Sequence, residues 1–212
     1  MRIEEHTVRF AGEAGDIETI VEDPGTPRGI ALVCHPHPLF GGANTNKVTQ
    51  TLARTFTRLG YVALRPNFRG VGGSAGTHAD GRGEAEDMLA VLDAARQTYG
   101  DLPVVLAGFS FGAYVQTRVA QALAAAGQPA QRLVLVGTAA GFVEGARQYD
   151  VQAVAADTLV IHGAVDTTVP LANVLAWAEP LDLPVVVVPG ADHFFHRRLH
   201  VIRDIVTRAW RH

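Results

Sequence analysis

The stretch Leu102-Pro103-Val104-Val105-Leu106-Ala107-Gly108-Phe109-Ser110-Phe111-Gly112 joins a predicted buried strand directly to a predicted helix. The run 102–107 is apolar and rich in β-branched residues, which is typical of a strand buried on both faces. From Phe111 to Ala126 apolar residues recur at a spacing of three and four, and Gly127 ends this helical pattern. Ser110 is therefore expected at the turn from strand to helix, where its hydroxyl lies clear of the backbone.

The chain contains two serines, Ser74 and Ser110, and both stand in the pattern Gly-x-Ser-x-Gly. This pattern marks a nucleophilic serine only where a strand enters it and a helix leaves it. Ser74 lies within Gly70 to Asp80, which holds four glycines and no helical period, so a loop is predicted there. The sequence therefore predicts Ser110, and not Ser74, as a nucleophile.

The composition limits the classes of protein to consider. A chain of 212 residues with 48% apolar residues is expected to form one domain over residues 1–212. The net charge of −3 comes without a basic stripe, so we expect no nucleic-acid partner. No apolar run is long enough to span a membrane and the first residues do not resemble a signal peptide, so we expect no membrane partner and a cytoplasmic location. Cys34, the single cysteine, is expected to be a buried thiol.

Strand and helix patterns alternate along most of the chain. Two strands near its start are expected to form a hairpin, and strand–helix units follow. This order predicts an α/β fold with a mostly parallel sheet of about eight strands and helices on both faces. Ligands of such sheets bind beyond the carboxyl ends of the strands. The expected strands are 3–10, 16–22, 30–34, 61–64, 102–107, 133–136, 158–161 and 185–188, and the expected helices are 46–59, 84–99, 111–126 and 197–210.

A serine hydroxyl needs a base within hydrogen-bond reach, and the base needs an orienting carboxylate. One known arrangement of such serine enzymes has the chain order serine, acid, histidine, and the candidates here follow that order. Asp166 follows a predicted strand and a glycine turn, although aspartate is also common in plain turns. His193 follows the last predicted strand by a few loop residues, and His196 is the alternative base.

An oxyanion hole needs two backbone donors. Phe111 is expected to open a helix, so its N–H group is free and lies at the positive end of the helix dipole. The second donor is expected in the loop after Cys34, where the two prolines have no N–H group. His37 is the better candidate there, and Leu39 is the next.

A metal site built from His35, His37, His193 and His196 is the alternative use of these histidines. No acidic or thiol ligand has a spacing that suits a zinc site with them. We therefore expect no metal and no other cofactor.

Five segments of the chain carry a further signal, and they are 34–38, 65–74, 108–112, 162–166 and 190–195. Together they resemble the α/β-hydrolase superfamily, most strongly its small esterase-like and dienelactone-hydrolase-like members. The resemblance covers nearly the whole chain and implies the catalytic triad Ser110, Asp166 and His193. It also implies that Arg69–Ser74 is the glycine loop after the fourth strand. Two departures are a serine where dienelactone hydrolases carry cysteine, and His-Pro where His-Gly is usual after the third strand.

The connection from Gly137 to Asp157 is too short for the helical cap that many members insert there, so an open site without a lid is expected. Leu39, Phe40, Phe142 and Phe194 are candidates for an apolar acyl pocket, although each is also suited to a core. The expected function is hydrolysis of a small ester or thioester through an acyl-enzyme. A peptidase or acyltransferase with the same triad, and a non-catalytic binding scaffold, stay open as alternatives, as does a homodimer.

Overall fold

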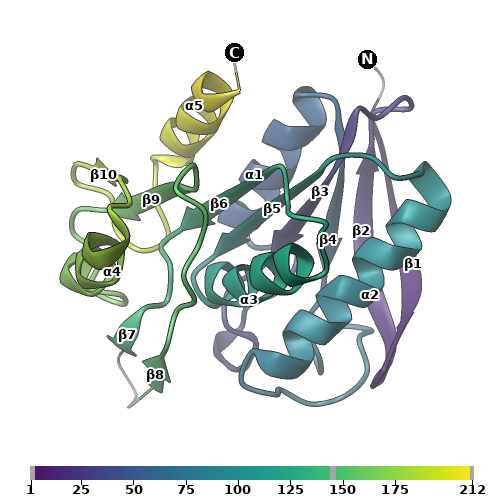
Figure 1. The fold of residues 1–212 in the computed structure, drawn as a ribbon, viewed down its shortest axis with the longest axis horizontal. Coiled ribbons are helices and arrows are strands. Elements are labelled where there is room, and N and C mark those ends of the chain that lie inside the picture. Colours follow the sequence, from purple (N-terminus) through teal and green to yellow (C-terminus); the bar gives the residue numbers. More distant parts are fainter. Residues whose placement is uncertain (1–2, 144–146, 211–212) are drawn as a thin grey trace.

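The computed structural model describes residues 3–143 and 147–210, and its centre is an eight-stranded sheet (Figure 1). The strand order is β1-β2-β4-β3-β5-β6-β9-β10. Strands β1 and β2 form an antiparallel hairpin, β2 pairs antiparallel with β4, and all other pairs in this sheet are parallel. The strands are β1 (Glu4–Gly12), β2 (Gly15–Asp23), β3 (Gly29–Cys34), β4 (Tyr61–Pro66), β5 (Val104–Phe109), β6 (Arg132–Val136), β9 (Leu159–Gly163) and β10 (Val185–Val188).

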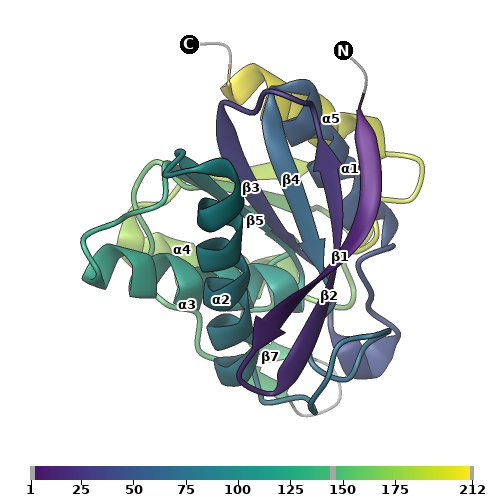
Figure 2. The same ribbon diagram turned by 90° about the vertical axis from the view of Figure 1, so that its right-hand side faces the viewer.

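Helices cover both faces of the sheet, as Figure 2 shows from the side. Helices α1 (Lys47–Arg58) and α5 (Leu199–Ala209) pack on one face. Helices α2 (Arg82–Tyr99), α3 (Phe111–Ala125) and α4 (Leu171–Ala178) pack on the other. A separate apolar cluster fills each interface, because strands such as β3, β4 and β5 are buried at every residue and present apolar side chains to both faces. The predicted α/β fold, with its mostly parallel sheet of about eight strands, is confirmed.

The two ends of the strand before Ser110 lie further along the chain than predicted. Strand β5 runs from Val104 to Phe109, because Gly108 and Phe109 still pair with β6. The strand therefore continues directly up to Ser110, and α3 begins at the next residue. Helix α5 begins at Leu199, later than expected, because Phe195 and Arg197 adopt left-handed backbone angles that no helix accepts.

Two features between β6 and α5 were not predicted. Helix α4 is apolar at nearly every position, so its sequence has no amphipathic period, and it buries only Val174 and Ala178. A small antiparallel ribbon of β7 (Gly141–Val143) and β8 (Arg147–Tyr149) lies beside α4 (Figure 1). Within the described residues the connection from β6 to β9 contains this ribbon and no helix, in accord with the expected absence of a cap domain.

Among the described residues, no helix is long and apolar enough to cross a membrane. The thiol of Cys34 is fully buried at the end of β3, and burial raises its pKa well above the ordinary value. It therefore stays protonated and acts as a small apolar side chain of the core.

Candidate active site

Ser110 stands in the sharp turn between β5 and α3. Its φ of 55° lies in the left-handed region, where a residue with a side chain is strained. A Cβ atom added at Gly108 would meet the backbone of Gly112, and one added at Gly112 would meet the carbonyl oxygens of Cys34 and His35. Both glycines are therefore required by the close approach of neighbouring chain, which explains the Gly-x-Ser-x-Gly spacing.

Ser110, His193 and Asp166 form a continuous hydrogen-bonded chain. His193 Nε2 lies 3.0 Å from Ser110 Oγ, and His193 Nδ1 lies 2.7 Å from Asp166 Oδ2. An ionised carboxylate only accepts hydrogen bonds, so Nδ1 carries the proton and Nε2 is left as the acceptor that faces the serine hydroxyl. The second carboxylate oxygen, Asp166 Oδ1, accepts hydrogen bonds from the backbone N–H groups of Thr168 at 2.9 Å and Val169 at 2.8 Å.

The parallel sheet brings these three side chains together. Ser110 follows β5, Asp166 lies in the loop after β9, and His193 lies in the loop after β10. Since β5, β6, β9 and β10 are parallel neighbours, their carboxyl ends meet at one edge of the sheet. The His193 ring is buried and packs on Phe109, with ring centroids 4.9 Å apart, and against Phe194 at 5.1 Å.

His162 lies next to this hydrogen-bonded chain of side chains, and the sequence did not predict its role there. Its Nε2 lies 2.9 Å from the carbonyl oxygen of Val169 and 3.4 Å from Asp166 Oδ2. Burial lowers the pKa of His162, so the ring is neutral and holds the loop that carries Asp166. A polar residue inside an otherwise apolar strand was the one signal for it in the sequence.

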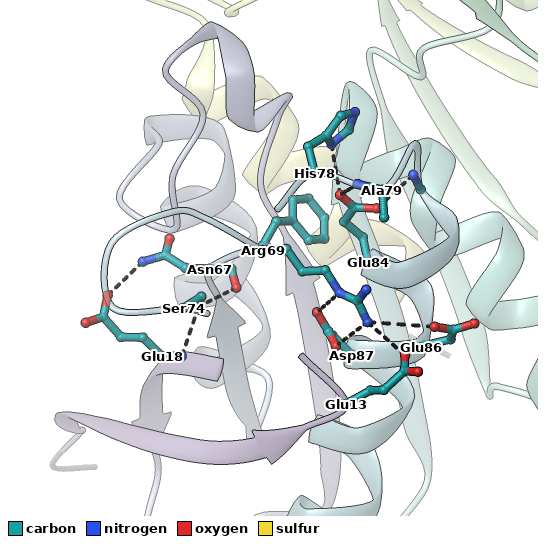
Figure 3. Close-up of polar contacts among 12 residues, drawn as sticks. Glu13, Glu18, Asn67, Arg69, Ser74, His78, Ala79, Glu84, Glu86 and Asp87 are labelled. Carbon is teal, nitrogen blue, oxygen red and sulfur yellow. Dashed lines mark hydrogen bonds and ion pairs between the residues drawn. The ribbon is translucent and has the colours of Figure 1, made fainter. Parts of the chain in front are cut away.

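Ser74, the other serine in the same pattern, uses its hydroxyl for structure (Figure 3). Ser74 Oγ accepts a hydrogen bond from the backbone N–H of Glu18 at 3.0 Å and donates one to the carbonyl oxygen of Asn67 at 2.8 Å. The Asn67 amide donates to the Glu18 carboxylate at 2.8 Å. The hydroxyl therefore fastens the glycine-rich loop to β2, and in the described part of the chain no histidine ring hydrogen-bonds to it.

Of the two candidate oxyanion donors, Phe111 directly follows Ser110, and His37 lines a cavity together with Ser110. Phe111 is the first residue of α3, so its N–H group has no carbonyl partner one turn back in the helix. In the loop after β3, Leu39 N–H donates to His37 Nδ1 at 3.2 Å, which leaves His37 N–H as the better candidate of the two. Burial, and to a lesser extent nearby His78, lower the pKa of His37 to about 4, so its ring is neutral and able to accept this bond.

The positions and contacts of the four histidines give little support to the alternative metal site. Both ring nitrogens of His35 are used, since Nε2 accepts from Phe68 N–H at 2.9 Å and Nδ1 lies 2.7 Å from the Pro36 carbonyl oxygen. His196 is exposed and pairs with Asp192 at 2.6 Å. Within residues 3–143 and 147–210, no group of three or more histidine, cysteine or acidic side chains is arranged to hold a metal ion.

A family model described as the alpha/beta hydrolase fold matches residues 32–184, more than half of the chain. The chain belongs to the α/β hydrolase family. A structure of an alpha-beta serine hydrolase homologue from Coxiella burnetii is 36% identical to this α/β hydrolase, with a TM-score of 0.83, and the match covers 99% of this chain and 98% of that one.

A serine hydrolase from Xanthomonas campestris, described as being without a lid, is 35% identical to this α/β hydrolase. Its TM-score is 0.86, with 100% of this chain and 95% of that chain covered. An uncharacterized protein of Rickettsia prowazekii is 42% identical over 110 residues, which are 51% of this chain. That match spans about half of the relative, 46% of its length.

One cavity opens at Ser110 in this α/β hydrolase, and a second lies next to it. The serine cavity, of about 390 Å³, is lined by Ser110 and His193 together with Phe40 and Phe194. The second cavity, of about 590 Å³, shares His37, Phe40 and Arg147 with the first and is also lined by Leu39. Phe142, the remaining candidate for the acyl pocket, is 62% exposed on β7 and is not among the residues that line either cavity.

Proposed function

We propose that this α/β hydrolase is a serine hydrolase that cleaves a small ester or thioester through an acyl-enzyme. The observation that carries the proposal is the hydrogen-bonded chain from Ser110 Oγ through His193 to Asp166. A neutral imidazole that accepts from the serine hydroxyl is positioned to take its proton as the oxygen attacks a carbonyl carbon. The likeness to serine hydrolases over almost the full chain supports the same function.

In the first half of the reaction, the bond from Ser110 Oγ to the carbonyl carbon forms while the hydroxyl proton moves to His193 Nε2. The carbonyl oxygen becomes an anion, and the N–H groups of Phe111 and His37 are proposed to stabilise it. The tetrahedral intermediate then collapses, the bond to the leaving alcohol or thiol breaks, and the leaving group takes the proton from His193. Asp166 stays ionised throughout and stabilises the imidazolium that forms.

In the second half, water attacks the acyl-enzyme and gives its proton to His193, and the acid leaves as Ser110 regains the proton. The apolar rings of Phe40 and Phe194 line the serine cavity next to the nucleophile and suit a short acyl chain. A volume of about 390 Å³ is near the lower end of small-molecule sites, which favours a small substrate.

The test compares Ser110→Ala with Ser74→Ala, since both variants remove one hydroxyl from the same five-residue pattern. Turnover of short-chain p-nitrophenyl esters and thioesters is expected to fall by roughly 10⁴- to 10⁶-fold in Ser110→Ala, as for other serine nucleophiles. Ser74→Ala is expected to keep its turnover. A fluorophosphonate probe should label the wild-type protein and Ser74→Ala but not Ser110→Ala. Undiminished turnover in a folded Ser110→Ala protein would refute the proposal.

A further inference from the structure

The larger of the two cavities is not used by the proposed reaction. It is bounded by α3 on one side, by the start of α2 and the loop before it on another, and by strand β8 of the small ribbon on the third. It shares His37, Phe40 and Arg147 with the serine cavity, so the two cavities are direct neighbours, and Phe111, which follows Ser110, lines the larger one. We call it the arginine cavity, after the lining residues Arg82, Arg118 and Arg147.

The charge of the arginine cavity is positive. Three guanidinium groups line it, and the one carboxylate among the described lining residues is that of Asp80. The Asp80 side chain is 98% exposed and pairs with His78 Nε2 at 3.4 Å. An anion that entered the cavity would therefore meet cationic groups from three separate elements.

The nearby Glu84 presents no carboxylate to a ligand in the cavity, because its side chain is buried and its oxygens accept hydrogen bonds elsewhere (Figure 3). Glu84 accepts hydrogen bonds from the backbone N–H groups of Ala79 at 2.9 Å and Gly81 at 2.8 Å. His78 Nδ1 lies 2.8 Å from Glu84 Oε1, so the same carboxylate lies against the His78 ring at the cavity wall. Glu84 thus shapes the loop before α2, and it is not among the residues that line the arginine cavity.

Arg118 is held in place before any ligand binds. Its guanidinium donates a hydrogen bond to the Tyr114 hydroxyl at 2.6 Å, and its central carbon lies 5.0 Å from the centre of the Tyr114 ring. Its Nε is buried and has no hydrogen-bond partner within the described part of the chain. Because Nε is buried, the outer nitrogens of the guanidinium are the donors that face a ligand, and a guanidinium presents them as a rigid fork that matches a carboxylate or a phosphate.

The interior of the arginine cavity is aromatic. Phe111, Tyr114 and Tyr149 line it and contact one another, with ring centroids 5.1–6.2 Å apart. Arg147 lies over the Phe40 ring, 4.1 Å from its centre, at the junction with the serine cavity. Apolar walls with cationic groups suit a ligand that has an apolar stem and an anionic end.

We propose that the arginine cavity binds a carboxylate or phosphate group at the far end of a substrate whose ester or thioester bond is held at Ser110. The preferred substrates are then anionic esters or thioesters, and Arg118 and Arg82 are specificity determinants. Cleavage of such substrates rests on the proposed function, whereas binding of their anionic group does not.

The first experiment measures kcat/KM for the mono-p-nitrophenyl esters of adipate and suberate. Each is compared with its neutral methyl ester of the same length, and a third pair carries a phosphonate at the far end. Wild-type protein is expected to favour the charged member of at least one pair by about tenfold or more at low salt, with a smaller preference at high salt. The carboxylate and phosphonate pairs distinguish the two kinds of anion.

Substitutions then locate the effect. Arg118→Gln and Arg82→Gln are each expected to reduce the ratio of charged to neutral turnover by about tenfold. Arg118→Gln loses the hydrogen bond to Tyr114 and with it some stability. Arg82 is exposed, so Arg82→Gln tests the proposal without that loss. The matched control is Arg58→Gln, an exposed arginine of α1 that lines neither cavity, and it is expected to keep the wild-type ratio.

The second experiment separates binding from catalysis. Titration calorimetry of Ser110→Ala with monomethyl adipate and monomethyl suberate, against the neutral dimethyl esters, measures binding of the anionic end without turnover. The proposal is supported if the charged ligand binds to Ser110→Ala and binds more weakly to the double variant that also carries Arg118→Gln. This result holds even if Ser110 proves not to be the nucleophile. The proposal is overturned if wild-type protein shows no preference for charge in any pair, or if Arg58→Gln lowers the ratio as much as Arg118→Gln.

Discussion

Replacing Asp166 by asparagine tests the proposed triad with almost no change in shape. In the structure Asp166 Oδ1 accepts two backbone N–H groups, and the asparagine oxygen can take over both bonds. The amide nitrogen then stands where Oδ2 now accepts from His193 Nδ1 at 2.7 Å. An amide N–H group donates, so His193 must accept at Nδ1 and carry its proton on Nε2.

With the proton on Nε2, His193 faces Ser110 as a donor and cannot take the hydroxyl proton. The same replacement of a triad aspartate in a serine protease lowers kcat by about 10⁴-fold. We expect a loss of 10³- to 10⁴-fold here, which corresponds to about 4–5.5 kcal/mol of transition-state stabilisation.

The assay is the steady-state turnover of a short-chain p-nitrophenyl ester, with thermal unfolding to show that Asp166→Asn is folded. The matched control is Asp192→Asn, because Asp192 precedes His193 directly but pairs with His196 at 2.6 Å on the surface. Its turnover is expected to stay within about threefold of wild type, as for surface changes outside the site. Activity of a folded Asp166→Asn protein within tenfold of wild type would refute the role assigned to this carboxylate.

Three further predictions concern stability. Ser74→Ala is expected to lower the free energy of unfolding by about 1–3 kcal/mol, because two backbone groups lose their partner; a value near zero in urea denaturation would contradict the bonds described. Gly112→Ala should cost about 3 kcal/mol or more, since its Cβ would overlap the carbonyl oxygens of Cys34 and His35, whereas Gly127→Ala, which meets nothing within 4 Å, should cost about 1 kcal/mol. Burial lowers the pKa of His35 from 6.5 to about 4, so the unfolded chain binds the proton first and stability should fall as the pH drops between these values, by up to about 3 kcal/mol. His35→Gln should remove the part of this loss of stability that His35 causes. An unchanged slope of the free energy of unfolding against pH in this variant would contradict the lowered pKa of His35.

The fold could be predicted because its signals are local. The apolar strand 104–109 followed at once by an amphipathic helix, and the repetition of such units, require a parallel sheet with helices on both faces. Helix α4 gave no such signal, since an almost uniformly apolar run has no period that separates a buried face from an exposed one. The strands of the β7–β8 ribbon have three residues each, too few for an alternation to be recognised.

The candidate triad could be proposed from chain order, because Ser110, Asp166 and His193 each follow a predicted strand. The arginine cavity could not be proposed in this way. Its three arginines, Arg82, Arg118 and Arg147, belong to α2, α3 and β8. The sequence around each one predicts only an ordinary surface arginine. The use of Leu39 N–H by the His37 ring also became visible only in three dimensions.

The sequence by itself determined the strained turn at Ser110, since only glycine fits where neighbouring backbone passes so closely on both sides. The tertiary structure alone decided that the hydroxyl meets an imidazole 83 residues further along the chain, and that three arginines surround one cavity. The reason is physical: sterics and hydrophobic periodicity act between near neighbours in the chain, whereas the distance between remote side chains depends on the register of parallel strands and on how helices pack across them.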